Sequence, residues 1–126
     1  MLGSSALVTF VPTTDPARAR AFFEGVLGLR VVSEDAFALV LDANGSTLRV
    51  TNVPSVPGFM PQPFTVAGWV VAEIAESVRA LQARGIRCER YEGMGQDELG
   101  IWLSPSGARV AWFRDPDGNV LSLTQP

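Results

Sequence analysis

The chain has 126 residues, a length that suits one compact domain or two small halves sharing a core. Its hydrophobic fraction of 47% and charged fraction of 18% are those of a globular protein, far from the composition of a disordered chain. The net charge of −3 offers no basic surface to a phosphate backbone, so we expect no nucleic-acid partner. The sequence contains neither lysine nor histidine, which excludes a Schiff-base lysine and any site that depends on imidazole.

The cysteine count and the N-terminal sequence bear on where the protein works. Cys88 is the single cysteine, so no disulfide can form within the chain and a structural zinc site of the Cys/His type is excluded. Residues 1–8 have neither the basic start nor the long apolar core of a signal peptide, and no stretch suits a membrane span. We therefore expect a cytoplasmic protein with no membrane partner.

The first half begins with a predicted strand and helix. Residues 4–11 are typical of a strand, which should end at Pro12 because proline cannot donate to a ladder. Residues 15–27 begin with an Asp-Pro pair, the typical N-cap and first residue of a helix. Gly28 is typical of the left-handed residue that ends one.

Three strands are expected next, over residues 29–33, 36–42 and 47–52. The Asn44-Gly45 pair between the last two strongly indicates a two-residue hairpin turn. The first half therefore has the predicted order β-α-β-β-β.

Residues 53–63 contain four prolines and are predicted to form a linker without regular structure. Two of its apolar residues, Phe59 and Met60, could cover a pocket as a lid or pack against the second half. We favour packing.

The same order of elements begins again after the linker. Residues 64–71 predict a strand and residues 73–84 a helix, which Gly85 should end as Gly28 ends the first. Further strands are expected over residues 86–91, 100–104, 108–113 and 120–124, with a tight turn over 115–119 before the last. The turn resembles a calcium loop but lacks the further oxygen ligands that one needs. We interpret the repeated order as an internal duplication of two modules, about 4–52 and 64–126.

Three segments carry a resemblance to a known superfamily: residues 15–29 (Asp-Pro-Ala-Arg-Ala-Arg-Ala-Phe-Phe-Glu-Gly-Val-Leu-Gly-Leu), 80–86 and 112–119 (Trp-Phe-Arg-Asp-Pro-Asp-Gly-Asn). With them the chain resembles the vicinal oxygen chelate superfamily, which includes glyoxalase I, extradiol dioxygenases, and fosfomycin- and bleomycin-resistance proteins. The resemblance implies a single domain over residues 1–126 with an α+β fold, in which two tandem βαβββ modules form curved sheets around a cleft. It also implies a homodimer.

The resemblance further implies four metal-ligand positions, one on the first and last strand of each module, which usually carry His, Gln or Glu. Here they fall near Val8 or Thr9, within residues 49–51, near Val66 and at Ser122. None of these side chains is a strong ligand for zinc, nickel or iron. We therefore expect no metal, no cofactor and no metal-dependent glyoxalase or dioxygenase activity.

Other candidates for chemistry are a group of carboxylates and the single thiol. Glu89, Glu92, Asp97 and Glu98 cluster in the sequence, and one of them, made basic by burial, could serve a metal-free enzyme. We favour a solvated strand end and loop. Cys88 lies between arginines, but no histidine could activate it, so buried filler is the preferred interpretation.

Aromatic and basic residues supply the candidate ligand contacts. Arg49 could hold an anionic ligand or pair with a neighbouring carboxylate. Aromatic rings suit a flat ligand as well as sheet-to-helix packing. If Val66 faces the concave side, strand alternation turns Trp69 toward the helix. The candidate ligand-binding residues are Phe10, Arg49, Tyr91, Trp102, Trp112 and Ser122.

We interpret the chain as a metal-independent protein that binds or sequesters a small aromatic or cationic molecule, the cation being favoured by the acidic balance. One alternative is a metal-independent lyase or isomerase that uses a cleft carboxylate. Another is a glyoxalase relative that has lost its activity.

Overall fold

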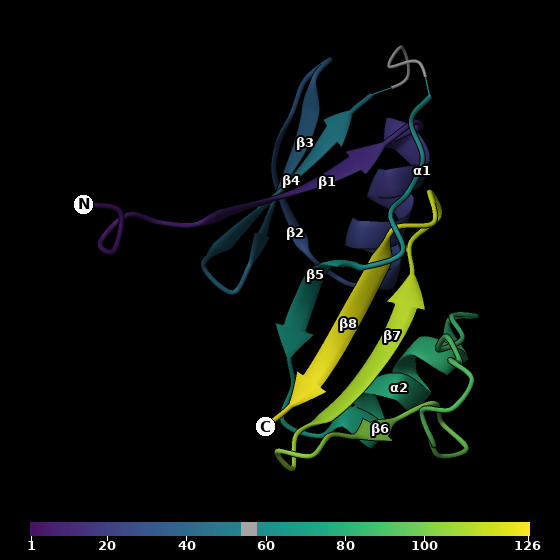
Figure 1. The fold of residues 1–126 in the computed structure, drawn as a ribbon. Coiled ribbons are helices and arrows are strands. Elements are labelled where there is room, and N and C mark those ends of the chain that lie inside the picture. Colours follow the sequence, from purple (N-terminus) through teal and green to yellow (C-terminus); the bar gives the residue numbers. More distant parts are fainter. Residues whose placement is uncertain (54–57) are drawn as a thin grey trace. The chain divides into compact units, whose positions relative to one another are not determined.

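The computed structural model describes residues 1–53 and 58–126, which divide into two compact units, Met1–Met60 and Pro61–Pro126. Each unit is a four-stranded mixed sheet with one helical segment packed against it (Figure 1). Both units have the element order β-α-β-β-β. This confirms the predicted α+β fold with its repeated order. Within the described ranges no helix is long and apolar enough to cross a membrane.

The N-terminal unit contains the elements β1 (Val8–Thr13), α1 (Pro16–Arg20), η1 (Ala21–Val26), β2 (Arg30–Glu34), β3 (Ala38–Ala43) and β4 (Ser46–Asn52). Its strand order is β1-β4-β3-β2, with β1 parallel to β4 and the other pairs antiparallel. The predicted hairpin turn is confirmed, because Asn44 and Gly45 have φ values of 52° and 90° and join the two paired strand ends.

The predicted strand over residues 4–11 is wrong at both ends. Strand β1 begins at Val8 and continues through Pro12 to Thr13. Because β1 is an edge strand, it makes ladder bonds on one side only, and a proline whose nitrogen faces the other side is tolerated there.

The first helix begins where its sequence predicts. The Arg18 backbone N–H donates to Asp15 Oδ1 at 3.1 Å, and Pro16 occupies the first turn. The second half, η1, is a π-helix, in which the Leu27 N–H donates to the Phe22 carbonyl five residues back. Gly28 follows with a φ of 76°, which confirms its role as the left-handed end.

The C-terminal unit contains β5 (Thr65–Val70), α2 (Ile74–Ala83), β6 (Trp102–Leu103), β7 (Arg109–Arg114) and β8 (Val120–Gln125). Its strand order is β5-β8-β7-β6, again with the first and last strands of the module parallel. Helix α2 lies against β7 and β8, and Gly85 ends it with a φ of 83°. The Gln125 side chain, in β8, accepts the N–H of Ile74 at 2.9 Å and so caps the start of the helix.

The strand predicted over residues 86–91 is wrong. One ladder-like bond is present, from the Glu89 N–H to the Trp112 carbonyl at 2.7 Å. The Gln96 side chain forms hydrogen bonds with two other backbone groups of this segment. Its Nε2 donates to the Glu89 carbonyl at 2.9 Å, and its Oε1 accepts the Tyr91 N–H at 2.7 Å. A glutamine amide therefore satisfies backbone groups that a neighbouring strand would otherwise bind.

Candidate functional site

The register of the N-terminal sheet places Phe10 and Arg49 side by side. Leu48 and Val50 of β4 are buried on the face against the first helix, so Arg49 lies on the opposite face. Phe10 of β1 is the register partner of Arg49 and is 60% exposed. Two of the candidate ligand contacts are therefore neighbours on the face away from the helix.

The electrostatic surroundings of Arg49 include a nearby carboxylate. Hydrogen bonds from the backbone N–H groups of Phe37 and Ala38 hold the pKa of Asp35 below its usual value, and the charge of Arg49 lowers it further. The two side chains are therefore close enough for their charges to interact. Both interpretations of Arg49, ligand contact and carboxylate partner, remain compatible with this position.

The C-terminal sheet sorts its tryptophans onto two faces. Ala111, Phe113 and Leu121 are fully buried on the face toward α2. Trp69 stacks on Phe113 with ring centroids 6.5 Å apart, which confirms that it packs on the helix side. Trp112, one residue along β7 from Phe113, lies on the face away from α2.

Tyr91, Trp102 and Trp112 form an aromatic cluster on that face. The Tyr91 and Trp112 rings meet edge to face with centroids 5.5 Å apart, and those of Trp102 and Trp112 are 5.9 Å apart at 35°. The two tryptophans are half-buried and Tyr91 is 36% exposed. Gln96 anchors the Tyr91 backbone, a positioning role that sequence reasoning missed.

Ser122 lies in the same row of the sheet as the cluster. It is the register partner of Trp112 on one side and of Gly68 on the other. A Cβ at Gly68 would collide with Ser122 Oγ, so the glycine makes room for the hydroxyl group. The structure therefore brings together four candidate residues in this unit, Tyr91, Trp102, Trp112 and Ser122, and two, Phe10 and Arg49, in the other.

The side chains at the four metal-ligand positions do not fit a metal ion. Val8, rather than Thr9, lies on the face of the sheet away from the helix. Thr9 is the register partner of Leu48, which is buried on the helix side. Val66 lies at an irregularity in β5, and Ser122 offers a single hydroxyl. Across residues 1–53 and 58–126, no three or more His, Cys, Asp and Glu residues form a group that could hold a metal ion. Aliphatic, guanidinium and hydroxyl groups do not make a zinc, nickel or iron site.

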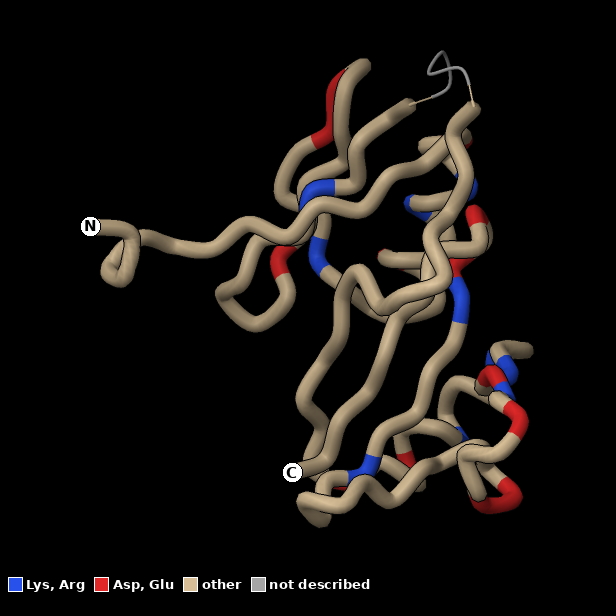
Figure 2. Tube along the Cα trace, viewed as in Figure 1, with Lys and Arg blue, Asp and Glu red and all other residues tan. Residues whose placement is uncertain are grey.

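Acidic positions, red in Figure 2, occur along the segment between α2 and β6, and the carboxylates of Glu89 and Asp97 form local contacts there. Glu89 Oε1 accepts Arg114 Nε at 2.6 Å, and Asp97 Oδ1 accepts the N–H groups of Leu99 and Ile101, both at 2.9 Å. Glu92 and Glu98 are exposed. These positions support the interpretation of a solvated loop over that of a buried catalytic base.

Cys88 is half-buried, and this burial raises the pKa of its thiol. The side chain is therefore a neutral thiol at neutral pH, which disfavours a nucleophile, although Cys88 is half-buried and not the fully buried filler that the sequence favoured.

Comparisons with known proteins identify the family. Residues 6–123 match the model of the Glyoxalase/Bleomycin resistance protein/Dioxygenase superfamily. A structure of a member of that superfamily from Sphaerobacter thermophilus is 19% identical with a TM-score of 0.77, covering 100% of both chains. A lactoylglutathione lyase from Agrobacterium tumefaciens is 17% identical with a TM-score of 0.74, covering 99% of this chain and 96% of that one. A glyoxalase family protein from Enterococcus faecalis is 19% identical with a TM-score of 0.73, covering 98% and 99%.

At these identities the structural likeness shows the fold alone. No curated protein sequence matches the chain. The match over residues 6–123 nevertheless covers nearly the whole sequence, and the chain belongs to the Glyoxalase/Bleomycin resistance protein/Dioxygenase superfamily.

Proposed function

We propose that the protein binds a small aromatic or cationic organic molecule at the aromatic cluster of its C-terminal sheet. The observation that carries this proposal is the contact of Trp112 with both Tyr91 and Trp102, three partly exposed rings on the face away from α2. Rings that serve only as filler are expected on the helix side, where Trp69 lies.

The cluster offers two kinds of contact to a ligand. An aromatic group gains roughly 0.5–1.5 kcal/mol per ring pair beyond its buried area, and a cation is attracted to the face of a tryptophan. Ser122, in the same row as Trp112, offers a hydroxyl group as a single polar contact. The net charge of −3 favours a cationic ligand over an anionic one.

Phe10 and Arg49 are proposed as a pair of ligand contacts on the N-terminal sheet, taken by itself. They combine an exposed ring with a guanidinium group on adjacent strands. Arg49 would suit a ligand that carries an acidic group. Arg49→Gln should then weaken the binding of acidic ligands and leave the binding of purely cationic ligands unchanged.

A thermal-shift screen tests the proposal directly, with drug-like cations, aromatic acids and glutathione adducts as probes. A compound that raises the melting midpoint is then titrated against Trp112→Phe and, as a matched control, Trp69→Phe. We expect Trp112→Phe to weaken binding about tenfold, because phenylalanine lacks the second ring of the indole, while Trp69→Phe binds as the wild type does. Failure of every compound to shift the midpoint, or equal weakening by both variants, would refute the proposal.

The same hits test the enzymatic alternative, a metal-independent lyase or isomerase. Its best-placed carboxylate, Glu89, would have to leave its ion pair with Arg114 to act as a base. We expect the wild type to turn over none of the bound compounds. Turnover by the wild type that Glu89→Gln or Glu92→Gln abolishes would favour the enzyme.

A homodimer is also part of the proposal. Leu7, which precedes edge strand β1, and Val8, its first residue, are 82% and 40% exposed, and an apolar edge of this kind suits association with a second chain. Sedimentation velocity at micromolar concentration should give the mass of two chains. A single-chain mass throughout would rule the dimer out.

A further inference from the structure

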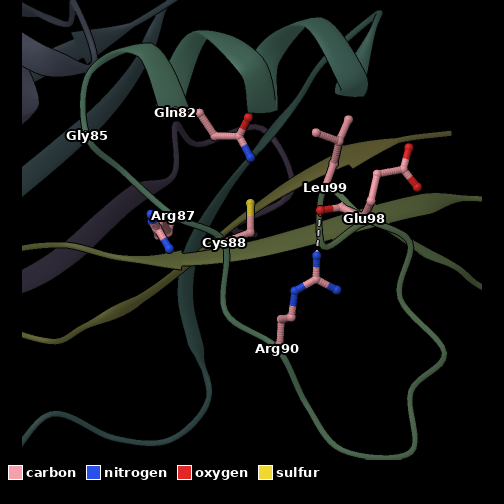
Figure 3. Close-up of a pocket in the computed structure, with 7 residues that line it drawn as sticks. All are labelled: Gln82, Gly85, Arg87, Cys88, Arg90, Glu98 and Leu99. Atoms are coloured by element: carbon pink, nitrogen blue, oxygen red, sulfur yellow. Dashed lines mark hydrogen bonds between the residues drawn. The ribbon is translucent and has the colours of Figure 1, made fainter.

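The C-terminal unit contains a cavity of about 410 Å³ beside the end of α2 (Figure 3). Its volume lies in the range of small-molecule sites, roughly 300–1,000 Å³. The aromatic cluster does not line it. The lining is mostly polar and includes Gln82, Arg87, Cys88, Arg90, Glu98 and Leu99.

Arg90 is a fixed positive charge in this cavity. Its Nη1 donates to the Asp97 carbonyl at 2.7 Å and its Nη2 to the Glu98 carbonyl at 2.6 Å. Backbone carbonyls orient a guanidinium group without neutralising its charge. The Glu98 carboxylate points away from Arg90 in Figure 3, so its side chain does not neutralise it.

Arg87 adds a second guanidinium group at the same cavity. It is exposed, and within the described ranges it forms no hydrogen bond or ion pair. The Gln82 amide extends from α2 toward the cavity, opposite the Cys88 sulfur (Figure 3). The lining therefore contains two guanidinium groups, one carboxylate, a neutral amide and a thiol that burial keeps protonated.

We propose that this cavity binds a small oxyanion, a phosphate or carboxylate group on a compact polar molecule, with Arg87 and Arg90 as the charged contacts. Arginine is suited to this role because its planar fork donates two parallel hydrogen bonds to such a group. The Gln82 amide supplies a further donor. With Leu99 as the main apolar residue of the lining, the cavity suits a polar ligand better than an aromatic one, and the site is separate from the aromatic cluster.

Cys88 gives this site a built-in reporter, because it is the single thiol of the chain and lines the cavity. N-ethylmaleimide, a neutral reagent, is reacted with the wild-type protein at increasing concentrations of inorganic phosphate or malonate, with sodium chloride matching the ionic strength. A bound anion should slow labelling hyperbolically, by covering the sulfur and by opposing its ionisation. Protection by phosphate alone identifies a phosphate site, and protection by malonate alone a carboxylate site. Labelling that neither anion slows beyond the salt control overturns the proposal.

Matched variants locate the effect. Arg87→Gln should raise the anion concentration needed for half-protection about tenfold, the loss of one charge-assisted hydrogen-bond donor. Arg79→Gln removes the same charge from an exposed position of α2 outside the cavity and should change nothing. Equal effects of the two would show non-specific screening and overturn the site.

Because Arg87 forms no bond within the described structure, its loss should not unfold the loop, whereas Arg90→Gln would also break two loop contacts. Trp112→Phe should leave protection unchanged, which separates this test from that of the aromatic cluster.

Discussion

Asp115 and Asn119 close the turn before β8 through three hydrogen bonds with each other. Asp115 Oδ1 accepts the Asn119 N–H at 2.9 Å, and Asp115 Oδ2 accepts Asn119 Nδ2 at 2.8 Å. The Asp115 N–H donates to the Asn119 carbonyl at 3.1 Å. Both residues are buried, with exposures of 5% and 1%. The carboxylate is thus used by the turn itself, which supports the interpretation of scaffold over that of a calcium loop.

Replacing Asp115 with alanine should destabilise the protein strongly. The variant leaves two backbone N–H groups, those of Asp117 and Asn119, and the Asn119 side chain without their acceptor. The expected loss in the free energy of unfolding is about 2–4 kcal/mol. Urea denaturation measures it, with Glu92→Ala as an exposed acidic control in the same unit. A loss no larger than that of the control would contradict the role of the turn.

The ionisation of Asp115 should make stability depend on pH. Burial raises the pKa of this carboxyl group above its ordinary value of 3.8, although hydrogen bonds from Asn119 and Asp117 oppose the shift. The folded state therefore binds the proton more tightly than the unfolded state. This contribution to stability is full below pH 3.8 and is lost as the pH rises through the folded pKa. The difference in unfolding free energy between wild type and Asp115→Asn should accordingly fall with rising pH above about 4. A difference that grows over that range would mean that folding lowers the pKa of Asp115 instead of raising it.

The parts of the fold that the sequence predicted depend on local chemistry. The Asp15 cap, the left-handed Gly28 and the Asn44-Gly45 hairpin are each specified by one or two residues. The two faces of the C-terminal sheet also followed from alternation along β5, which turned Trp69 toward the helix.

The features that the sequence did not predict depend on strand pairing or on side chains that lie outside the segment itself. Strand β1 runs through Pro12 because of its place at the edge of the sheet, which a single strand does not reveal. Residues 86–91 are not a strand because Gln96 binds Glu89 and Tyr91 through its amide. The cavity beside α2 is lined by the same loop, whose path depends on these Gln96 contacts. The sequence therefore indicated four carboxylates in this segment but no binding site.

The contact between Gly68 and Ser122 should be measurable as a coupling between two substitutions. Gly68→Ala places a Cβ against Ser122 Oγ and 3.2 Å from the Ser122 carbonyl oxygen. We expect a loss of about 1–3 kcal/mol, the usual cost of overpacking. In a Ser122→Ala background the new Cβ meets the Cβ of residue 122 at 3.6 Å, an ordinary contact, so the loss should shrink by about 1 kcal/mol. Additive effects in this double-mutant cycle would mean that the two residues do not face each other.

Two glycines at the end of the first helix should respond to alanine in opposite directions. Gly28 has a φ of 76°, a conformation in which a Cβ is strained, so Gly28→Ala should lower the free energy of unfolding by about 1 kcal/mol. Gly25 lies inside η1, and an added Cβ there meets nothing within 4 Å. Gly25→Ala should therefore raise stability by about 0.5–1 kcal/mol, because it removes backbone freedom from the unfolded chain. Urea denaturation of the two single variants measures both changes in the free energy of unfolding, a loss for Gly28→Ala and a gain for Gly25→Ala. If Gly25→Ala destabilises as much as Gly28→Ala, the boundary between the π-helix and its left-handed end lies elsewhere.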